Sequence, residues 1–272
     1  MRYLRSPRRP SNRSSAVEGK GLKSDSAGST QLEATERSLA AGEFTVNFAT
    51  AGNGPPLMLL HGSEPQENWH VWEPILAMAD TYRLIAPDLL GYGKSARPEE
   101  TPDFRVQAQM LRDFVDKLGI ERLSLMGSGW GGQVALEFAL DWPESVASLV
   151  LVASTYDKDQ LRRLQKLRKP TLIIFAEDDM VTQLKAGYLL RDAIGTSRLE
   201  VLGAVARDPR YDFRMSHRLQ KFRAPQVLQL ARSFLSNPDA MVAEPPEMEN
   251  ELKGVELREE SQKGDAAPSG TP

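Results

Sequence analysis

Short apolar runs alternate with helical segments through the middle of this 272-residue chain, and this order constrains the fold more than any other feature. The runs have the length and continuous hydrophobicity of strands buried on both faces. Strands alternating with helices predict a mostly parallel central sheet, helices on both faces and a site at the strands' carboxyl ends. Strands are expected at 57–60, 82–87, 122–126, 146–153, 171–176 and 198–202, with an early antiparallel strand at 43–50. Helices are expected near 71–80, 105–118, 130–141, 184–194 and 224–236.

Length and composition favour one α/β domain over residues 41–237, because a chain with 40% hydrophobic residues can bury one sizeable core. Residues 1–40 carry eight Lys/Arg against four Asp/Glu and many serines, which indicates a disordered tail or, alternatively, a transit peptide. Residues 238–272 carry nine Asp/Glu against three Lys/Arg and are expected to form a disordered acidic tail.

Several classes of protein are disfavoured by what the sequence lacks. The chain has no cysteine and only three histidines, so we expect no disulfide framework, no metal centre and no cofactor. It has no apolar run long enough to cross a bilayer and no secretory signal, which predicts a cytoplasmic or, with a transit peptide, an organellar location. The near-neutral core gives no reason to expect nucleic acid as a partner.

Residues 127–131 read Gly-Ser-Gly-Trp-Gly, after an expected strand and before an expected helix. At a sharp strand-to-helix turn the central residue has positive φ, and the positions two before and two after it must be small. A turn centred on Gly129 places Gly127 and Gly131 at those positions. A turn centred on Ser128 would place a methionine and a tryptophan there, which would collide, so we expect Gly129 at the centre.

Stretches around this turn resemble the α/β-hydrolase fold superfamily, of the AB hydrolase-1 type, over about residues 43–236. The matching stretches are Leu57–Gly62 (strand and oxyanion turn), Asp88–Ser95 (D-x-x-G-x-G-x-S loop), Leu123–Phe138 (nucleophile elbow and helix), Pro143–Ser154 (helix end and strand) and Pro170–Asp179 (strand delivering the acid). In that superfamily the elbow reads Gly-x-Ser-x-Gly and its serine is the nucleophile. The resemblance therefore places Gly129 at the nucleophile position, with Ser128 beside it, and implies that serine-hydrolase chemistry is lost.

The segment 155–170 is shorter than the lid of several helices that many such proteins carry there. Its leucines at spacing three and its six basic residues between 158 and 169 predict one short helix. This lidless layout resembles the abhydrolase domain-containing protein 14 subfamily more than the lidded epoxide hydrolases.

The resemblance also suggests the remaining triad positions. Its spacing places the acid at Asp179, with Asp178 as a neighbouring alternative, although a carboxylate capping the next helix would read the same way. The histidine should follow the strand at 198–202 within a few residues, but His217 comes about eleven residues late. Two alternatives stay open: a longer loop folds His217 back over Gly129, or His217 is a surface residue.

Backbone donors are expected to remain at the site. The resemblance assigns the oxyanion N–H groups to Ser63 and Trp130, next to His61 and Gly62, which are expected to form the turn. His70 lies beside two tryptophans in sequence and is expected to pack rather than react.

Three hypotheses of function follow. The first is a pseudo-hydrolase that binds a small carbonyl or carboxylate ligand or a protein partner. The second is an ester hydrolase in which His217 and Asp179 activate a water molecule. The third is an interaction scaffold, in which the basic segments 158–169 and 207–223 lie on the site side of the sheet and attract an anionic partner or the chain's own acidic tail.

Overall fold

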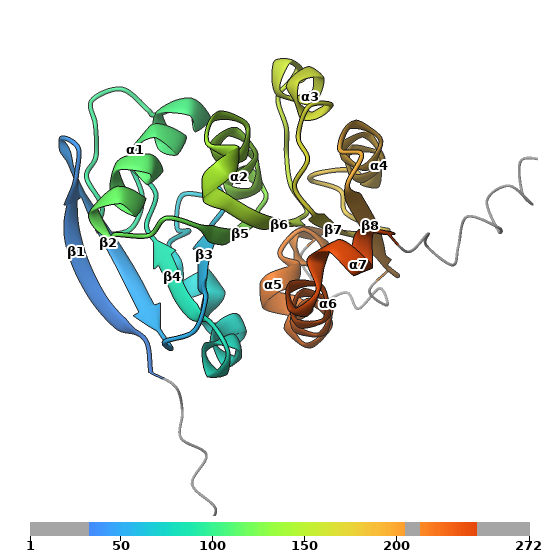
Figure 1. Cartoon of the computed structure of the whole chain (residues 1–272), viewed down its shortest axis with the longest axis horizontal. Coiled ribbons are helices and arrows are strands. Elements are labelled where there is room, and N and C mark those ends of the chain that lie inside the picture. Colours follow the sequence, from blue (N-terminus) through green and yellow to red (C-terminus); the bar gives the residue numbers. More distant parts are fainter. Residues whose placement is uncertain (1–32, 205–212, 244–272) are drawn as a thin grey trace, which may run out of the picture. The chain divides into compact units, whose positions relative to one another are not determined.

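The computed structural model describes residues 33–204 and 213–243 (Figure 1). Its strands are β1 (Thr35–Ala41), β2 (Phe44–Ala51), β3 (Pro56–Leu60), β4 (Arg83–Pro87), β5 (Leu123–Ser128), β6 (Val146–Val152), β7 (Thr171–Ala176) and β8 (Ser197–Leu202). They form one sheet in the order β1-β2-β4-β3-β5-β6-β7-β8. β2 pairs antiparallel with β1 and β4, and the pairings from β4 onward are parallel. The predicted mostly parallel sheet is confirmed.

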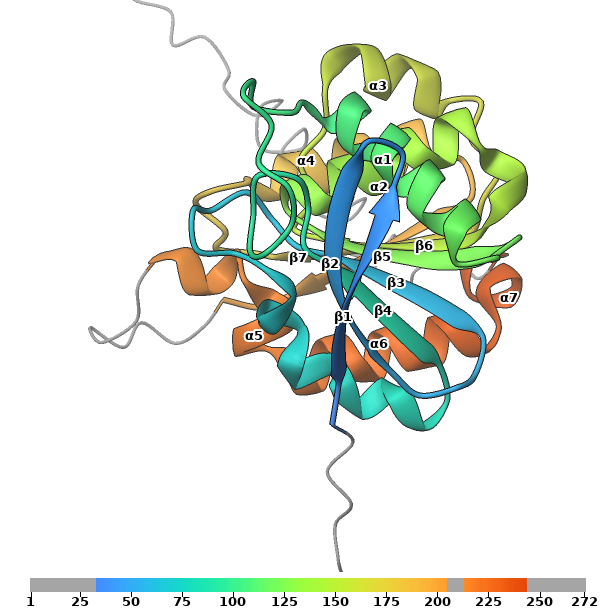
Figure 2. The same ribbon diagram turned by 90° about the vertical axis from the view of Figure 1, so that its left-hand side faces the viewer.

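Helices cover both faces of this sheet (Figure 2). One face carries α1 (Phe104–Lys117), α2 (Trp130–Asp141), α3 (Lys158–Leu164) and α4 (Leu184–Ala193). The other carries the 3₁₀ helix η1 (Trp69–Asp80), α5 (Leu219–Phe222) and α6 (Ala224–Ser236). The short elements η2 (Pro143–Ser145), η3 (Phe213–Ser216) and α7 (Pro238–Ala243) complete the described chain. The predicted single short helix in place of a lid is α3.

Two hydrophobic cores result, one on each side of the sheet. Met58 and Leu60 of β3 enter the core beneath α1 and α2, whereas Leu57 and Leu59 enter the core beneath η1 and α6. All four side chains are fully buried. Because both faces of β3 are covered, it has no polar face, and its sequence is therefore a continuous apolar run.

The domain extends further at both ends than the sequence predicted. β1 begins within the predicted tail 1–40, and α7 lies beyond the predicted boundary at 237. The side chains of β1 are mostly exposed because β1 is an edge strand, so it lacks the apolar pattern that reveals a strand. Residues 1–32 and 244–272 of the predicted tails lie outside the described chain.

The sheet order brings two loops together at one edge. β3 is hydrogen-bonded to β4 on one side and to β5 on the other. The strands that follow β3 in the chain are therefore added to opposite sides of it, which makes this a switch point in the strand order. In open α/β sheets ligands bind at such a switch point, outside the carboxyl ends of the strands. Here the loop after β3 and the turn after β5 meet, because Leu60 is paired with Gly127.

Substitution of Gly131 tests how closely α2 approaches β3. A Cβ atom at Gly131 would lie 2.3 Å from the backbone oxygens of both Leu60 and His61, so backbone must shift to admit it. We expect Gly131→Ala to lower the free energy of unfolding by about 3 kcal/mol or more in urea denaturation. Gly195→Ala is the matched control, since a Cβ there would meet nothing within 4 Å, and it should change the free energy by less than about 0.5 kcal/mol. Equal effects of the two substitutions would contradict the close approach.

Candidate active site

The turn between β5 and α2 is centred on Gly129. Its φ of 53° and ψ of −118° lie where L side chains are strained, and its backbone N–H donates to Val152 O at 2.9 Å. Gly127 is equally constrained, because a Cβ there would lie 2.5 Å from Gly131 O. Ser128 is still part of β5 and is only 3% exposed. The glycines two residues to either side therefore centre the turn on Gly129 and not on Ser128.

A side chain at Gly129 would point at an imidazole. A Cβ built on Gly129 lies 3.1 Å from His217 Nε2. Apart from the two chain neighbours of Gly129, His217 Cε1 is the only other atom of the described residues within 4 Å of that Cβ. His217 stands between η3 and α5, and its side chain is only 14% exposed. The alternative of a surface histidine is therefore wrong: the chain after β8 folds back and brings His217 over Gly129.

Asp179 holds this imidazole from the other side. Its Oδ2 lies 3.0 Å from His217 Nδ1, and its side chain is fully buried. Its other oxygen accepts the backbone N–H groups of Val181 at 2.8 Å and Thr182 at 2.9 Å. One carboxylate thus orients the ring and closes the loop after β7. The alternative of a helix cap is wrong, because α4 begins at Leu184 and has no side-chain cap at its N-cap residue Gln183. Asp178 Oδ1 is buried but makes no hydrogen bond to the described residues.

The hydrogen bond to Asp179 sets the chemistry of the ring. When Nδ1 donates its proton to the carboxylate, Nε2 is left as an acceptor. That acceptor faces the place that the Cβ of a larger residue at position 129 would occupy. The geometry therefore presents a base to whatever molecule occupies the space above Gly129.

An ion cluster that sequence reasoning missed ties the histidine segment to the loop after β3. The guanidinium of Arg218, next to His217, contacts Glu64, and its Nε lies 3.5 Å from Glu67 Oε1. Glu67 is 5% exposed, and burial raises the pKa of its carboxyl. No motif spacing links these three residues in sequence, so only the folded chain reveals the cluster.

His61 occupies the turn as a structural residue. Its ring is fully buried, its Nε2 accepts the backbone N–H of Leu89 at 3.0 Å, and its Nδ1 lies 2.7 Å from Gly62 O. Both nitrogens are therefore used within the protein. Burial lowers the pKa of this imidazole to about 4 from its ordinary 6.5, which keeps it neutral at pH 7.

The predicted oxyanion donors lie in the loop after β3 and in the first turn of α2. Trp130 is the first residue of α2, and the first N–H groups of a helix have no intrahelical acceptor. Ser63 is exposed, and its carbonyl accepts the Tyr92 hydroxyl at 3.0 Å. His70 is exposed on η1, stacked on Trp69 and paired with Glu73, and takes no part in the ion cluster or the histidine–aspartate pair.

Among residues 33–204 and 213–243, no group of three or more His, Asp or Glu side chains is placed to hold a metal ion. Within the same residues no helix is both long enough and apolar enough to cross a membrane.

Comparison with known proteins supports the fold. Residues 55–166 match the model of the α/β-hydrolase fold family. The chain is 40% identical over 128 residues to a fluoroacetate dehalogenase of a Burkholderia species, covering 44% of this chain and 41% of that protein. It is 37% identical over 121 residues to a soluble epoxide hydrolase of a Corynebacterium species, strain C12, covering 44% and 42%. The match thus spans about two fifths of the length of these curated relatives.

Solved structures agree over a longer stretch. A predicted CIB-like hydrolase from Thermoplasma acidophilum has a TM-score of 0.67 at 21% identity, covering 76% of this chain and 99% of the other. The 2-hydroxy-6-oxo-6-phenylhexa-2,4-dienoate hydrolase of a Rhodococcus species, strain RHA1, has a TM-score of 0.66 at 17% identity, covering 75% and 99%. The chain has the α/β-hydrolase fold.

The lowered pKa of His61 predicts an acid-sensitive contribution to stability. Between about pH 6.5 and 4 the unfolded chain binds a proton on this ring that the folded chain does not, so the free energy of unfolding falls as the pH falls. A shift of this size corresponds to about 3 kcal/mol. We expect His61→Gln to lose most of this pH dependence, measured by urea denaturation from pH 7.5 to 4, and the exposed control His70→Gln to retain it. An unchanged slope in His61→Gln would contradict the assignment.

Proposed function

We propose that this chain uses the site at the elbow without forming a covalent enzyme intermediate, and that it binds a small carbonyl or carboxylate compound there. One observation carries the proposal: the residue at the centre of the elbow, facing His217 Nε2, is Gly129. Glycine has no side chain to attack a substrate. It also avoids the backbone strain of about 1–3 kcal/mol that a side chain at this positive φ would store.

The surroundings of Gly129 support binding of a carbonyl or carboxylate oxygen. α2 begins directly after the elbow, and the N–H groups and dipole at a helix N-terminus favour negative charge. The loop bearing Ser63 lies beside it, because β3 and β5 are paired. This arrangement retains donors of the oxyanion type while lacking a nucleophile. The short α3 in place of a lid also supports the proposed likeness to the abhydrolase domain-containing protein 14 subfamily.

The histidine–aspartate pair favours a second candidate, a hydrolase that uses water directly. A water molecule above Gly129 would donate a hydrogen bond to His217 Nε2, and Asp179 would steady the imidazolium that forms when the proton is taken. General base catalysis of this kind contributes about 10²–10⁴-fold, so activated substrates are expected. The curated relatives are named for dehalogenation and epoxide hydrolysis, so fluoroacetate and a simple epoxide belong in the substrate panel.

A scaffold with a basic rim fits the structure less well. Arg163 of α3 is paired with Glu137 at 2.7 Å and also contacts Asp141, so part of the rim's charge is neutralised. Arg168 and Lys169 precede β7 and therefore lie at its amino end, contrary to the expectation that the whole segment faces the site. A crossover between parallel strands must return to the amino edge of the sheet, which explains the difference. Residues 207–212 of the second basic segment lie outside the described chain.

Restoring a nucleophile separates the two candidates. We expect wild type to be inert toward short-chain p-nitrophenyl esters, fluoroacetate and a simple epoxide, and Gly129→Ser to gain ester hydrolysis that His217→Ala in the same background lowers by at least about 100-fold. Ser128→Ala is the matched control and should change nothing. Wild-type turnover that falls in His217→Ala and in Asp179→Asn would support the water-activating hydrolase instead.

Covalent labelling tests what both candidates share. A fluorophosphonate probe should leave wild type unmodified by intact-mass spectrometry and should label Gly129→Ser at that serine. Stoichiometric labelling of Ser128 or Ser63 in wild type would overturn the proposal.

A further inference from the structure

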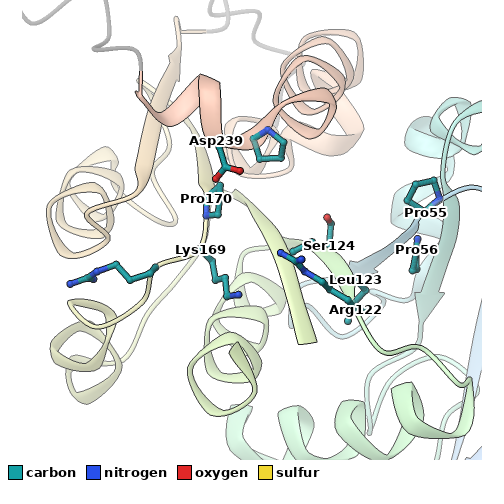
Figure 3. Close-up of a pocket in the computed structure, with 11 residues that line it drawn as sticks. Pro55, Pro56, Arg122, Leu123, Ser124, Lys169, Pro170 and Asp239 are labelled. Carbon is teal, nitrogen blue, oxygen red and sulfur yellow. The ribbon is translucent and has the colours of Figure 1, made fainter. Parts of the chain in front are cut away.

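A cavity of about 470 Å³ lies at the edge of the sheet opposite Gly129 (Figure 3). It is bounded by the starts of β3, β5, β6 and β7 and by α7. β5 begins at Leu123 beside this cavity and ends beside Gly129, so six strand residues, about 20 Å, separate the two places. The cavity is therefore independent of the site described above.

The charged side chains around this cavity are mostly cationic. The side chains of Arg122 and Lys169 make no hydrogen bond or ion pair with any described residue, and Lys169 is bonded only through its carbonyl. Arg168 donates to the carbonyls of Gln165 and Leu167 in its own turn. Asp239 of α7 contributes a carboxylate to the lining. In Figure 3 Asp239 lies beside Pro170, and the Lys169 ammonium points away from it. Two cations are thus left free to meet a ligand.

An irregularity in β6 supplies a hydroxyl donor to the same space. Leu123 is paired with Val146 but Leu125 with Leu149, so β6 holds one extra residue at this point. There Ser148 Oγ lies 2.9 Å from Ser124 Oγ, and Ser124 lines the cavity. Two hydroxyls carry two hydrogens and the bond between them uses one, so the pair retains a hydrogen to donate.

We propose that this cavity binds a small organic anion. Its oxyanion group would accept from the planar guanidinium of Arg122, the ammonium of Lys169 and the serine pair. Its apolar body would pack on Pro55, Pro56 and Ala147, which also line the cavity. A cavity of this volume lies within the range of small-molecule sites.

The oxyanion can come from two sources. One is a free metabolite. The other is the chain itself, because residues 244–272 follow directly on α7 and carry eight Asp/Glu against three Lys/Arg. A tethered carboxylate benefits from a high effective concentration and competes with a free ligand.

Phenyl phosphate is the probe, because it joins an oxyanion to an apolar ring. We expect the full-length protein to bind it saturably in calorimetry at low salt, and Arg122→Gln/Lys169→Gln to weaken binding at least tenfold. Arg37→Gln/Lys117→Gln removes the same charge from exposed residues elsewhere and should change the Kd by less than twofold. Gly129→Ser should also leave the Kd unchanged, which separates this proposal from the proposed function. Thermal melting checks that each variant is folded.

A variant of the full chain with Glu244, Glu247, Glu249 and Glu251 changed to Gln distinguishes the sources. Binding that tightens at least tenfold in this variant identifies the chain's own carboxylates as a natural occupant, and unchanged binding identifies a free anion. In either background the loss in Arg122→Gln/Lys169→Gln must persist. No saturable binding in both backgrounds, or an equal loss in the control pair, would overturn the proposal.

Discussion

β3 and β5 lie side by side at the site, and α2 packs its backbone directly against the end of β3. The contact admits no side chain, because a Cβ on Gly131 would meet two backbone oxygens at 2.3 Å. This approach positions the first turn of α2 beside the loop that follows β3. The position of the elbow, of its N–H groups and of the space that His217 faces therefore depends on the close packing of α2 against β3.

The sheet was predictable because burial on both faces leaves a clear mark on a strand's composition. β3 and β5 to β7 are mostly apolar in sequence, and their expected bounds agree with the structure within two residues. β1 left no such mark, since an edge strand in contact with water needs neither alternation nor hydrophobicity. Its pairing with β2 is made by backbone hydrogen bonds, which almost any sequence can form. The helix expected at 71–80 is a 3₁₀ helix that contains Pro74.

The site was predictable where a residue's place follows from a regular element. Gly129 and Asp179 follow the ends of β5 and β7 at fixed spacing, so their positions could be read from the chain. His217 follows a long connection, and sequence alone left its position open. The structure shows what holds it: Asp179 on one side and, through Arg218, two glutamates of the loop after β3 on the other. Such long-range ion pairs have no sequence period and so no sequence signal.

Asp179 divides its two carboxylate oxygens between the imidazole and the loop that begins at Met180. That loop carries the most exposed large apolar side chains of the described chain, Met180 at 75% and Val181 at 49%. The same carboxylate therefore holds both the exposed loop and the imidazole, so that any change to Asp179 acts on the outer surface and on the site together.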